Sequence, residues 1–411
     1  MGDIGDIDVG FVRLLIENDI GQSGIRVRDF SVERAAENGE NYGSVILRIR
    51  VGYYREDDSC PSNGDYWKAS YVGKFMPVQP QHYQTIKNFK IFDREILVYQ
   101  KLLPAALKLQ EEPKIRPDVP LCVFAGVTPF EAVVMRDLKE EGFKLADRIQ
   151  GLNVAEFRLV MEAYGKFHSF GFLLVQKTDL ASHELLQENP FEKFPDSDQF
   201  IRNSMVTLRK LLEETPGQEN NVQRLSRFIQ EKAKDGNHFK SFMRPRGSRK
   251  TILHGDCWSN NMMFRYENDE PVEVRLLDLQ MIRLGNPSQD LLHALYTCTS
   301  RSIHRDQTEF YKIYHQSLMR HCEALGIHLD YTFESLLEDV EANREFGFFM
   351  AVFQIPVILM EKGDAPDLTK TDMDPETMLQ MREKSLFSRT NVVVKQRMLE
   401  LVDDMVASKV L

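Results

Sequence analysis

The stretch LHGDCWSNNMMF at residues 253–264, followed by VRLLDLQ at residues 274–280, decides the fold of this chain. Its apolar segments predict short strands, and the polar residues between them predict a loop and a turn. The expected strands cover residues 251–253, 262–264 and 272–277, and the turn covers residues 267–271. If these strands form one small sheet, Asp256, Asn261 and Asp278 lie at the same end of it.

Two carboxylates and one amide at that end form a site whose ligands are all oxygens. Such a set suits a hard cation such as Mg²⁺, which keeps waters and phosphate oxygens as its other ligands. One carboxylate can also stay off the metal and orient a hydroxyl for attack on phosphorus. Each residue taken alone is better explained as a loop cap or a turn residue. Together, with Asp278 placed 22 residues after Asp256 (278 − 256), they favour phosphotransfer.

The same residues resemble those of a known family. His254-Gly255-Asp256 with Asn261, and then Leu277-Asp278-Leu279-Gln280, are similar to the paired phosphotransfer motifs of the aminoglycoside phosphotransferases and choline kinases. Within that group the motifs most resemble the ecdysteroid kinase-like family, over roughly residues 24–348. Leu279 stands where that family's pattern usually has Phe, and an apolar Leu can fill the same kind of pocket. His254 is expected to orient the loop by hydrogen bonding.

The resemblance implies an α+β, bilobal protein-kinase-like fold. A small N-lobe, residues 1–137, would contain an antiparallel sheet plus a helix. A larger and mainly helical C-lobe, residues 138–411, would contain the catalytic loop, the metal site and the acceptor pocket. The length of 411 residues suits two domains with separate cores.

Composition narrows the range of partners. A net charge of −10 and a pI near 5.6 argue against nucleic acid or an anionic membrane surface as the main partner. No stretch approaches the ~20 apolar residues of a membrane span, and the N-terminus lacks the features of a signal peptide. The five cysteines are widely spaced and have no zinc-type spacing, so we expect a reduced, cytoplasmic protein.

The N-terminal third has the pattern of a helix followed by strands. The helix is expected at residues 9–20, and the strands at residues 25–32, 44–54, 66–76, 117–125 and 130–135. By itself the glycine-containing segment 37–43 is most simply a hairpin turn. The family resemblance implies that its Gly39, Asn41, Tyr42 and Gly43 belong to the hairpin that covers the nucleotide phosphates.

Lys74 lies inside an apolar strand, where a lysine is seldom buried unless it is paired. Glu95, in a helix expected at residues 83–102, is the matching partner, and such a pair holds nucleotide phosphates in kinases. The alternative is a strand-edge lysine whose ammonium group reaches water. The resemblance favours the functional interpretation, with Lys68 as the fallback candidate.

The strand at residues 130–135 runs into Met135-Arg136-Asp137-Leu138, and a solvated connector at residues 139–143 follows. In a bilobal kinase arrangement this segment is the hinge, where backbone groups contact an adenine. Met135 and Asp137 are therefore candidate nucleotide-binding residues, and Leu138 marks the expected boundary between the lobes.

The rest of the chain has a helical pattern. Helices are expected at residues 154–174, 306–325, 331–359 and 375–410, with two or three more between residues 178 and 248. His168 is interpreted as a packed helix histidine and Cys257 as a packing residue rather than a nucleophile. Asp290 either caps the helix that follows it or bonds the catalytic loop. Residues 362–375 are expected to form an acidic surface loop.

The resulting hypothesis is a kinase that uses ATP and Mg²⁺ to phosphorylate a hydroxyl of a small molecule. Asp256 would orient or deprotonate that hydroxyl, Asn261 and Asp278 would hold Mg²⁺, and Lys74, fixed by Glu95, would neutralise phosphate charge. As the family name implies, the acceptor would be an ecdysteroid or another lipophilic alcohol, and a choline- or ethanolamine-type acceptor stays open.

Two alternatives from other classes remain at this point. One is a non-catalytic binding protein that keeps the bilobal fold, and the other is a metal-dependent phosphohydrolase that uses the same carboxylates. The phosphohydrolase leaves the pairing of Lys74 with Glu95 unexplained. ATP consumption that depends on an added alcohol would separate all three.

Overall fold

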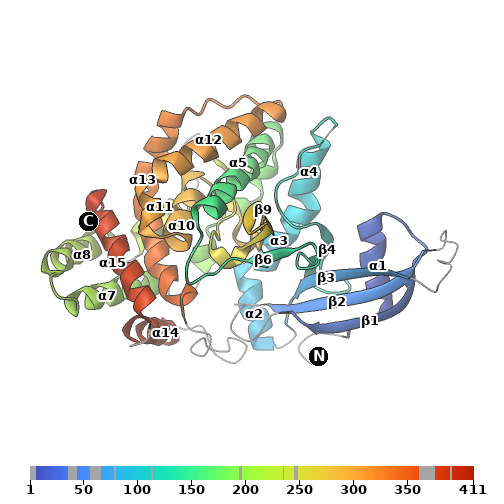
Figure 1. Cartoon of the computed structure of the whole chain (residues 1–411), viewed down its shortest axis with the longest axis horizontal. Coiled ribbons are helices and arrows are strands. Elements are labelled where there is room, and N and C mark those ends of the chain that lie inside the picture. The colour runs from blue at the N-terminus through green and yellow to red at the C-terminus, as the bar shows by residue number, and fades with distance from the viewer. Residues whose placement is uncertain are drawn as a thin grey trace. The chain divides into compact units, whose positions relative to one another are not determined.

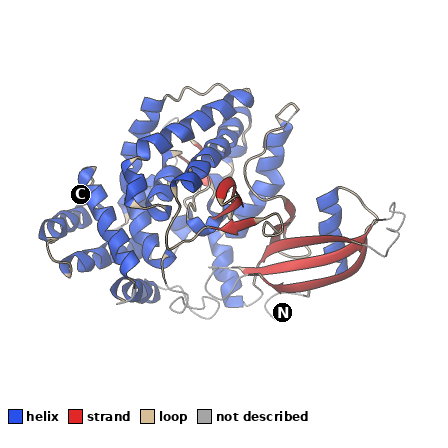
Figure 2. Cartoon of the chain, viewed as in Figure 1, coloured by secondary structure: helices blue, strands red, loops and turns tan. Residues whose placement is uncertain are grey.

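The computed structural model describes residues 6–35, 44–55, 66–77, 80–112, 114–193, 197–234, 236–244, 249–360, 375–388 and 391–411. The chain divides into two compact units. The first contains the described residues up to Pro104 together with Val119–Lys144, and the second contains Ala105–Asp118 and the described residues from Leu145 on. Figure 1 labels many of the elements of both units, and Figure 2 colours helices and strands differently.

The first unit is built on a five-stranded sheet in the order β1-β2-β3-β5-β4, and each pair of neighbours is antiparallel. The strands are β1 (Arg26–Arg34), β2 (Val45–Tyr54), β3 (Trp67–Phe75), β4 (Cys122–Gly126) and β5 (Ala132–Arg136). Along β2 the side chains of Val45, Leu47, Ile49 and Val51 are buried, as the period of two predicted. The antiparallel sheet expected in this part of the chain is confirmed.

Helix α1 (Val9–Ile20) covers one face of this sheet. Asp8 begins it by accepting a hydrogen bond from the Phe11 N–H at 2.8 Å, and Gly21 ends it in a left-handed conformation with φ of 68°. The Phe11 ring packs edge-on against Phe75 of β3, with the ring centroids 6.3 Å apart. The helix predicted at residues 9–20 is therefore confirmed.

The single helix predicted at residues 83–102 is wrong. The chain instead forms α2 (Pro80–Phe89), α3 (Ile91–Leu97), a π-helical segment (Val98–Leu102) and α4 (Leu103–Lys108). Lys90 interrupts the helix because its backbone is left-handed, with φ of 54°. A one-residue interruption leaves the period of apolar residues almost unchanged, so periodicity does not reveal it.

The second unit is mainly helical, which confirms the α+β class. Its helices are α5 (Val154–Lys177), α6 (Glu184–Gln187), α7 (Ser197–Glu213), α8 (Glu219–Lys232), α9 (Asn237–Phe242), α10 (Ser288–Cys298), α11 (Arg301–Arg305), α12 (Gln307–Ala324), α13 (Phe333–Ile358), α14 (Pro375–Phe387) and α15 (Val392–Ala407). One final helix over residues 375–410 is not found, because α14 ends and Asn391 starts α15 by accepting from the Val394 N–H at 3.3 Å. Among the described residues, no helix has the length and apolarity needed to cross a membrane.

Short strands position the quoted motifs. They are β6 (Phe143–Leu145), β7 (Thr251–Leu253), β8 (Met262–Glu267), β9 (Glu270–Leu276) and β10 (Arg283–Gly285). β8 and β9 form a hairpin whose two turn residues, Asn268 and Asp269, both have positive φ. β7 pairs with β10 in a separate two-stranded sheet, so the single small sheet expected from the sequence is wrong.

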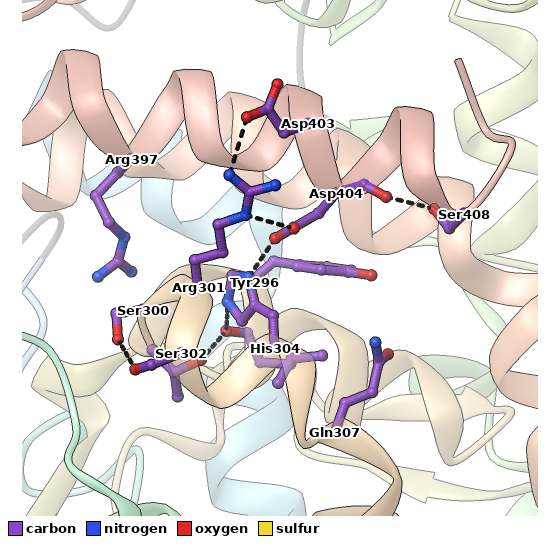
Figure 3. A network of polar contacts seen from close by, with 12 residues as sticks. Tyr296, Ser300, Arg301, Ser302, His304, Gln307, Arg397, Asp403, Asp404 and Ser408 are labelled. Atoms are coloured by element: carbon purple, nitrogen blue, oxygen red, sulfur yellow. Dashed lines mark hydrogen bonds and ion pairs between the residues drawn. The ribbon is translucent and has the colours of Figure 1, made fainter.

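Helix α15 is joined to α11 by a network of charged side chains (Figure 3). Arg301 of α11 contacts Asp403 at 2.9 Å and Asp404 at 3.3 Å. The two ring nitrogens of His304 contact Asp404 Oδ2 at 2.6 Å and the Leu295 carbonyl at 3.1 Å. Asp404 is 16% exposed and contacts both Arg301 and His304, whereas Asp403 is 43% exposed and contacts Arg301.

Asp404→Ala is expected to lower the free energy of unfolding by about 1.5–3 kcal/mol, because it removes a shared acceptor of charged hydrogen bonds. Asp403→Ala is the matched control, since an exposed ion pair contributes about 1 kcal/mol or less. Urea unfolding of both variants measures the difference. Equal losses in the two variants would contradict the larger contribution expected of Asp404.

Candidate active site

Asp290, in the first turn of α10, holds the loop that begins at His254. Its carboxylate accepts from the His254 N–H at 2.7 Å and from the Gly255 N–H at 3.1 Å. The same carboxylate contacts Nε2 of His168 at 3.0 Å, and the Asp290 side chain is 1% exposed. Of the two roles predicted for Asp290, bonding the loop is confirmed, and His168 is packed inside the helical unit as expected.

The electrostatics of Asp290 follow from these contacts. Burial alone raises the pKa of this carboxyl, but His168, Arg283 and His254 outweigh burial and hold the pKa well below its usual value. Asp290 is therefore ionised at neutral pH. A buried anion at this position attracts the backbone N–H groups of the loop and fixes their direction.

Glycine is required at position 255. Its backbone is left-handed, with φ of 82°, and a Cβ at this position would collide with the carbonyl oxygen of Met281. The loop therefore lies directly on the chain that leads into β10, and the close approach makes the sharp turn before Asp256.

Asp256 and Asn261 are brought together. Nδ2 of Asn261 donates to the Asp256 carbonyl and to Asp256 Oδ2, both at 3.0 Å. Because Nδ2 faces Asp256, the amide oxygen Oδ1 points away from it. That oxygen is the ligand type that Mg²⁺ prefers, so the donor set fits the predicted metal.

His254 joins the two motifs. Its Nε2 donates to the Leu277 carbonyl at 2.8 Å, and its Nδ1 accepts from the Asp256 N–H at 3.3 Å. The Leu277 N–H in turn donates to the Asn261 carbonyl at 2.8 Å. Asp278 follows directly, with φ of 64°, and the Leu279 side chain after it is fully buried. Asp278 thus follows directly on Leu277, whose N–H bonds the Asn261 carbonyl.

In the first unit, Lys74 of β3 meets Glu95 of α3. Their Nζ and Oε2 atoms lie 2.9 Å apart, and the side chains are 12% and 3% exposed. A lysine held in this way is fixed in direction, because its partner is an almost fully buried carboxylate. The fallback candidate Lys68 is exposed and lies over the Tyr66 ring, 5.5 Å from the centroid.

Asp137 and Met135 are the other described residues that the sequence predicts to bind the nucleotide. The Asp137 carboxylate is bound by Arg48 at 2.6 Å and by the Ser70 hydroxyl at 2.8 Å. Burial raises the pKa of Asp137, but Arg48 and Ser70 outweigh it, so the pKa lies below its usual value. Met135 is buried in β5. The four hairpin residues Gly39, Asn41, Tyr42 and Gly43 lie outside the described residues. So does the acidic loop expected at residues 362–375, except for Pro375, which begins α14.

Two residues near Asp256 have no counterpart in the quoted motifs. Gln354 of α13 donates from Nε2 to Asp256 Oδ1 at 3.5 Å, and His293 of α10 contacts Gln354. No sequence signal identifies them except that a polar Gln interrupts the apolar run FFMAVFQIPVI at residues 348–358.

Cys257 is a packing residue, as predicted. Its thiol is fully buried, and burial raises the pKa of the thiol well above its usual value, which makes it a poor nucleophile. The Cys257 carbonyl lies 3.2 Å from the Thr297 hydroxyl. Arg397 of α15 donates to the Thr297 carbonyl at 3.3 Å, so a side chain of α15 reaches the end of α10 beside the loop.

Comparisons with known proteins agree with the motifs. The model of the ecdysteroid kinase-like family matches residues 38–327, and the chain therefore belongs to that family. No curated protein sequence matches.

Solved structures that resemble the chain include two small-molecule phosphotransferases. One is spectinomycin phosphotransferase APH(9)-Ia in complex with ADP and spectinomycin, with 11% identity, a TM-score of 0.44, and coverage of 96% of this chain and 99% of that one. The other is choline kinase from Cryptosporidium parvum Iowa II, with 9% identity, a TM-score of 0.46, and coverage of 98% of each chain.

Proposed function

We propose that this protein is an ATP- and Mg²⁺-dependent phosphotransferase that phosphorylates a hydroxyl of a small molecule. The observation that carries the proposal is the pairing of Asp256 with Asn261 through Nδ2, which turns the Asn261 amide oxygen away from Asp256. Family membership supports the same reaction class. The Lys74–Glu95 pair supports a nucleotide as the phosphoryl donor.

In this mechanism Asp256 binds the acceptor hydroxyl and takes its proton. The acceptor oxygen forms a bond to the γ-phosphorus while the bond from that phosphorus to the β,γ-bridging oxygen breaks, which leaves ADP. Asn261 Oδ1 and Asp278 would hold Mg²⁺, which supplies positive charge to the phosphates when bound. His254 and Asp290 act through the backbone and keep Asp256 in one position.

The acceptor class that we propose is a lipophilic alcohol, with ecdysteroids as the first choice. Family membership supports this class. The test is a screen of ecdysteroids, sterols, amino alcohols and plant phenolics for label transfer from [γ-³²P]ATP. Transfer to an ecdysteroid or sterol supports the proposal, and transfer only to choline or ethanolamine replaces the acceptor class. ATP consumption without an acceptor indicates a hydrolase, and nucleotide binding without consumption indicates a binding protein.

Lys74→Met is expected to weaken MgADP binding by about 10- to 100-fold, the range that one lost charged hydrogen bond gives. Lys68→Met is the matched control, because the same change is made at an exposed lysine of the same strand. Calorimetric titration with MgADP measures both. Equal affinities for the two variants would remove Lys74 from the nucleotide site.

A further inference from the structure

A chain of polar contacts leads from the Cys257 N–H through His293 and Gln354 to the Asp256 carboxylate. The Cys257 N–H donates to Nδ1 of His293 at 3.3 Å, so that nitrogen is an acceptor without a hydrogen. The ring proton is then on Nε2, which donates to Oε1 of Gln354. Since Oε1 faces His293, the amide nitrogen of Gln354 faces the other way, 3.5 Å from Asp256 Oδ1.

The environment of His293 keeps this direction fixed. The ring is 1% exposed, and burial lowers the pKa of His293 to about 4, although Gln354 and Asp290 partly oppose burial. The other charged or titratable groups that act on the ring, Arg283 and His254, lower the pKa further. A neutral ring carries one hydrogen, and the Cys257 N–H decides which nitrogen holds it.

Asp256 is thereby held from two sides. Asn261 of the catalytic loop donates to Oδ2, and Gln354 of α13 donates to Oδ1. We propose that Gln354, oriented by His293, is a positioning residue for Asp256. The inference rests on the proposed function, in which the direction of this carboxylate decides whether an acceptor hydroxyl meets the γ-phosphorus.

The position of Gln354 favours this role over a purely structural one. Gln354 is half-buried, and its neighbours on α13 include buried apolar residues such as Val352 and Ile355. A glutamine at this position instead places one acceptor on His293 and one donor on Asp256. Both polar ends of the amide are therefore used.

The kinetic test compares Gln354→Leu and Gln354→Glu with Gln176→Leu. Gln354→Leu removes the donor. Gln354→Glu keeps the side-chain length and the contact with His293 but offers Asp256 no donor. Gln176 makes the control, because it is an exposed glutamine of α5 that donates to the His328 carbonyl at 3.0 Å. With ecdysone as acceptor, both Gln354 variants are expected to lose about 10- to 100-fold in kcat with KM for ATP unchanged within about twofold.

A loss of kcat equal to that of Gln176→Leu would overturn the proposal. So would a loss in kcat accompanied by a parallel rise in KM for ATP and a matching drop in Tm, which would indicate general disruption. If wild type transfers no label to any acceptor, the proposed function fails, and the positioning contact is then decided by NMR without an acceptor. In that measurement Asp256→Asn should shift the Gln354 side-chain amide signals, and unchanged signals would overturn the contact.

Discussion

Asp256→Asn is expected to lower kcat about 10³-fold, within the range that a general base contributes. Asn has nearly the shape of Asp and can still accept from Nδ2 of Asn261, although its amide nitrogen cannot accept from Gln354. It cannot take the proton of the acceptor hydroxyl. Because Asp256 is not assigned to the nucleotide, the affinity for MgADP should change by less than about threefold.

The measurement is label transfer from [γ-³²P]ATP together with calorimetric titration of MgADP. Asp269→Asn is the matched control, because it makes the same change in the exposed turn between β8 and β9. Transfer by Asp256→Asn at the wild-type rate would show that another group receives the proton, and the mechanism would fail at its central residue.

Asp290→Ala is expected to lower the free energy of unfolding by about 3–5 kcal/mol, the cost of removing one partner from a buried charged network. It leaves the N–H groups of His254 and Gly255 and the ring of His168 without their acceptor. Phosphotransfer should be lost as well, because the loop that carries Asp256 is no longer held. Urea unfolding measures the change, and Asp330→Ala, at an exposed position, is the control.

The pH dependence of stability gives an independent check on Asp290. Its pKa in the folded protein lies well below the value of about 3.9 for an unfolded chain. Its contribution is therefore fully present above about pH 4 and is lost as pH falls further. The pKa of His293 is lowered to about 4 in the folded protein, so the unfolded chain binds this proton at a higher pH. Stability therefore also falls as the pH falls from about 6.5 to 4. Asp290→Ala should lack the fall in stability below about pH 4. The assignment would be contradicted if this variant lost stability below pH 4 as the wild type does.

Local patterns predicted much of the secondary structure. The strand β2 alternates between buried and more exposed side chains, and α1 is capped by Asp8 and Gly21, so both are encoded within a few residues. The Lys74–Glu95 contact was also predictable, because a lysine in an apolar strand needs a partner and the family pattern names one. Whether these residues bind a nucleotide stays a prediction.

Other features depend on contacts between distant segments. β7 (residues 251–253) pairs with β10 (residues 283–285) although other elements lie between them in the sequence. No turn signal predicts this pairing. His293 and Gln354 belong to different helices, α10 and α13, and meet only after these helices pack. Lys90 breaks its helix through backbone conformation alone. Periodicity along the chain contains none of this information.

The reach of Arg397 to Thr297 has a consequence for biosynthesis. Arg397 lies 140 residues after Cys257 (397 − 257). A ribosome therefore releases the loop that contains Cys257 long before it makes the side chain that bonds the end of α10. A nascent chain that carries both motifs is still without this contact, and the end of α10 gains it only after α15 has emerged and packed.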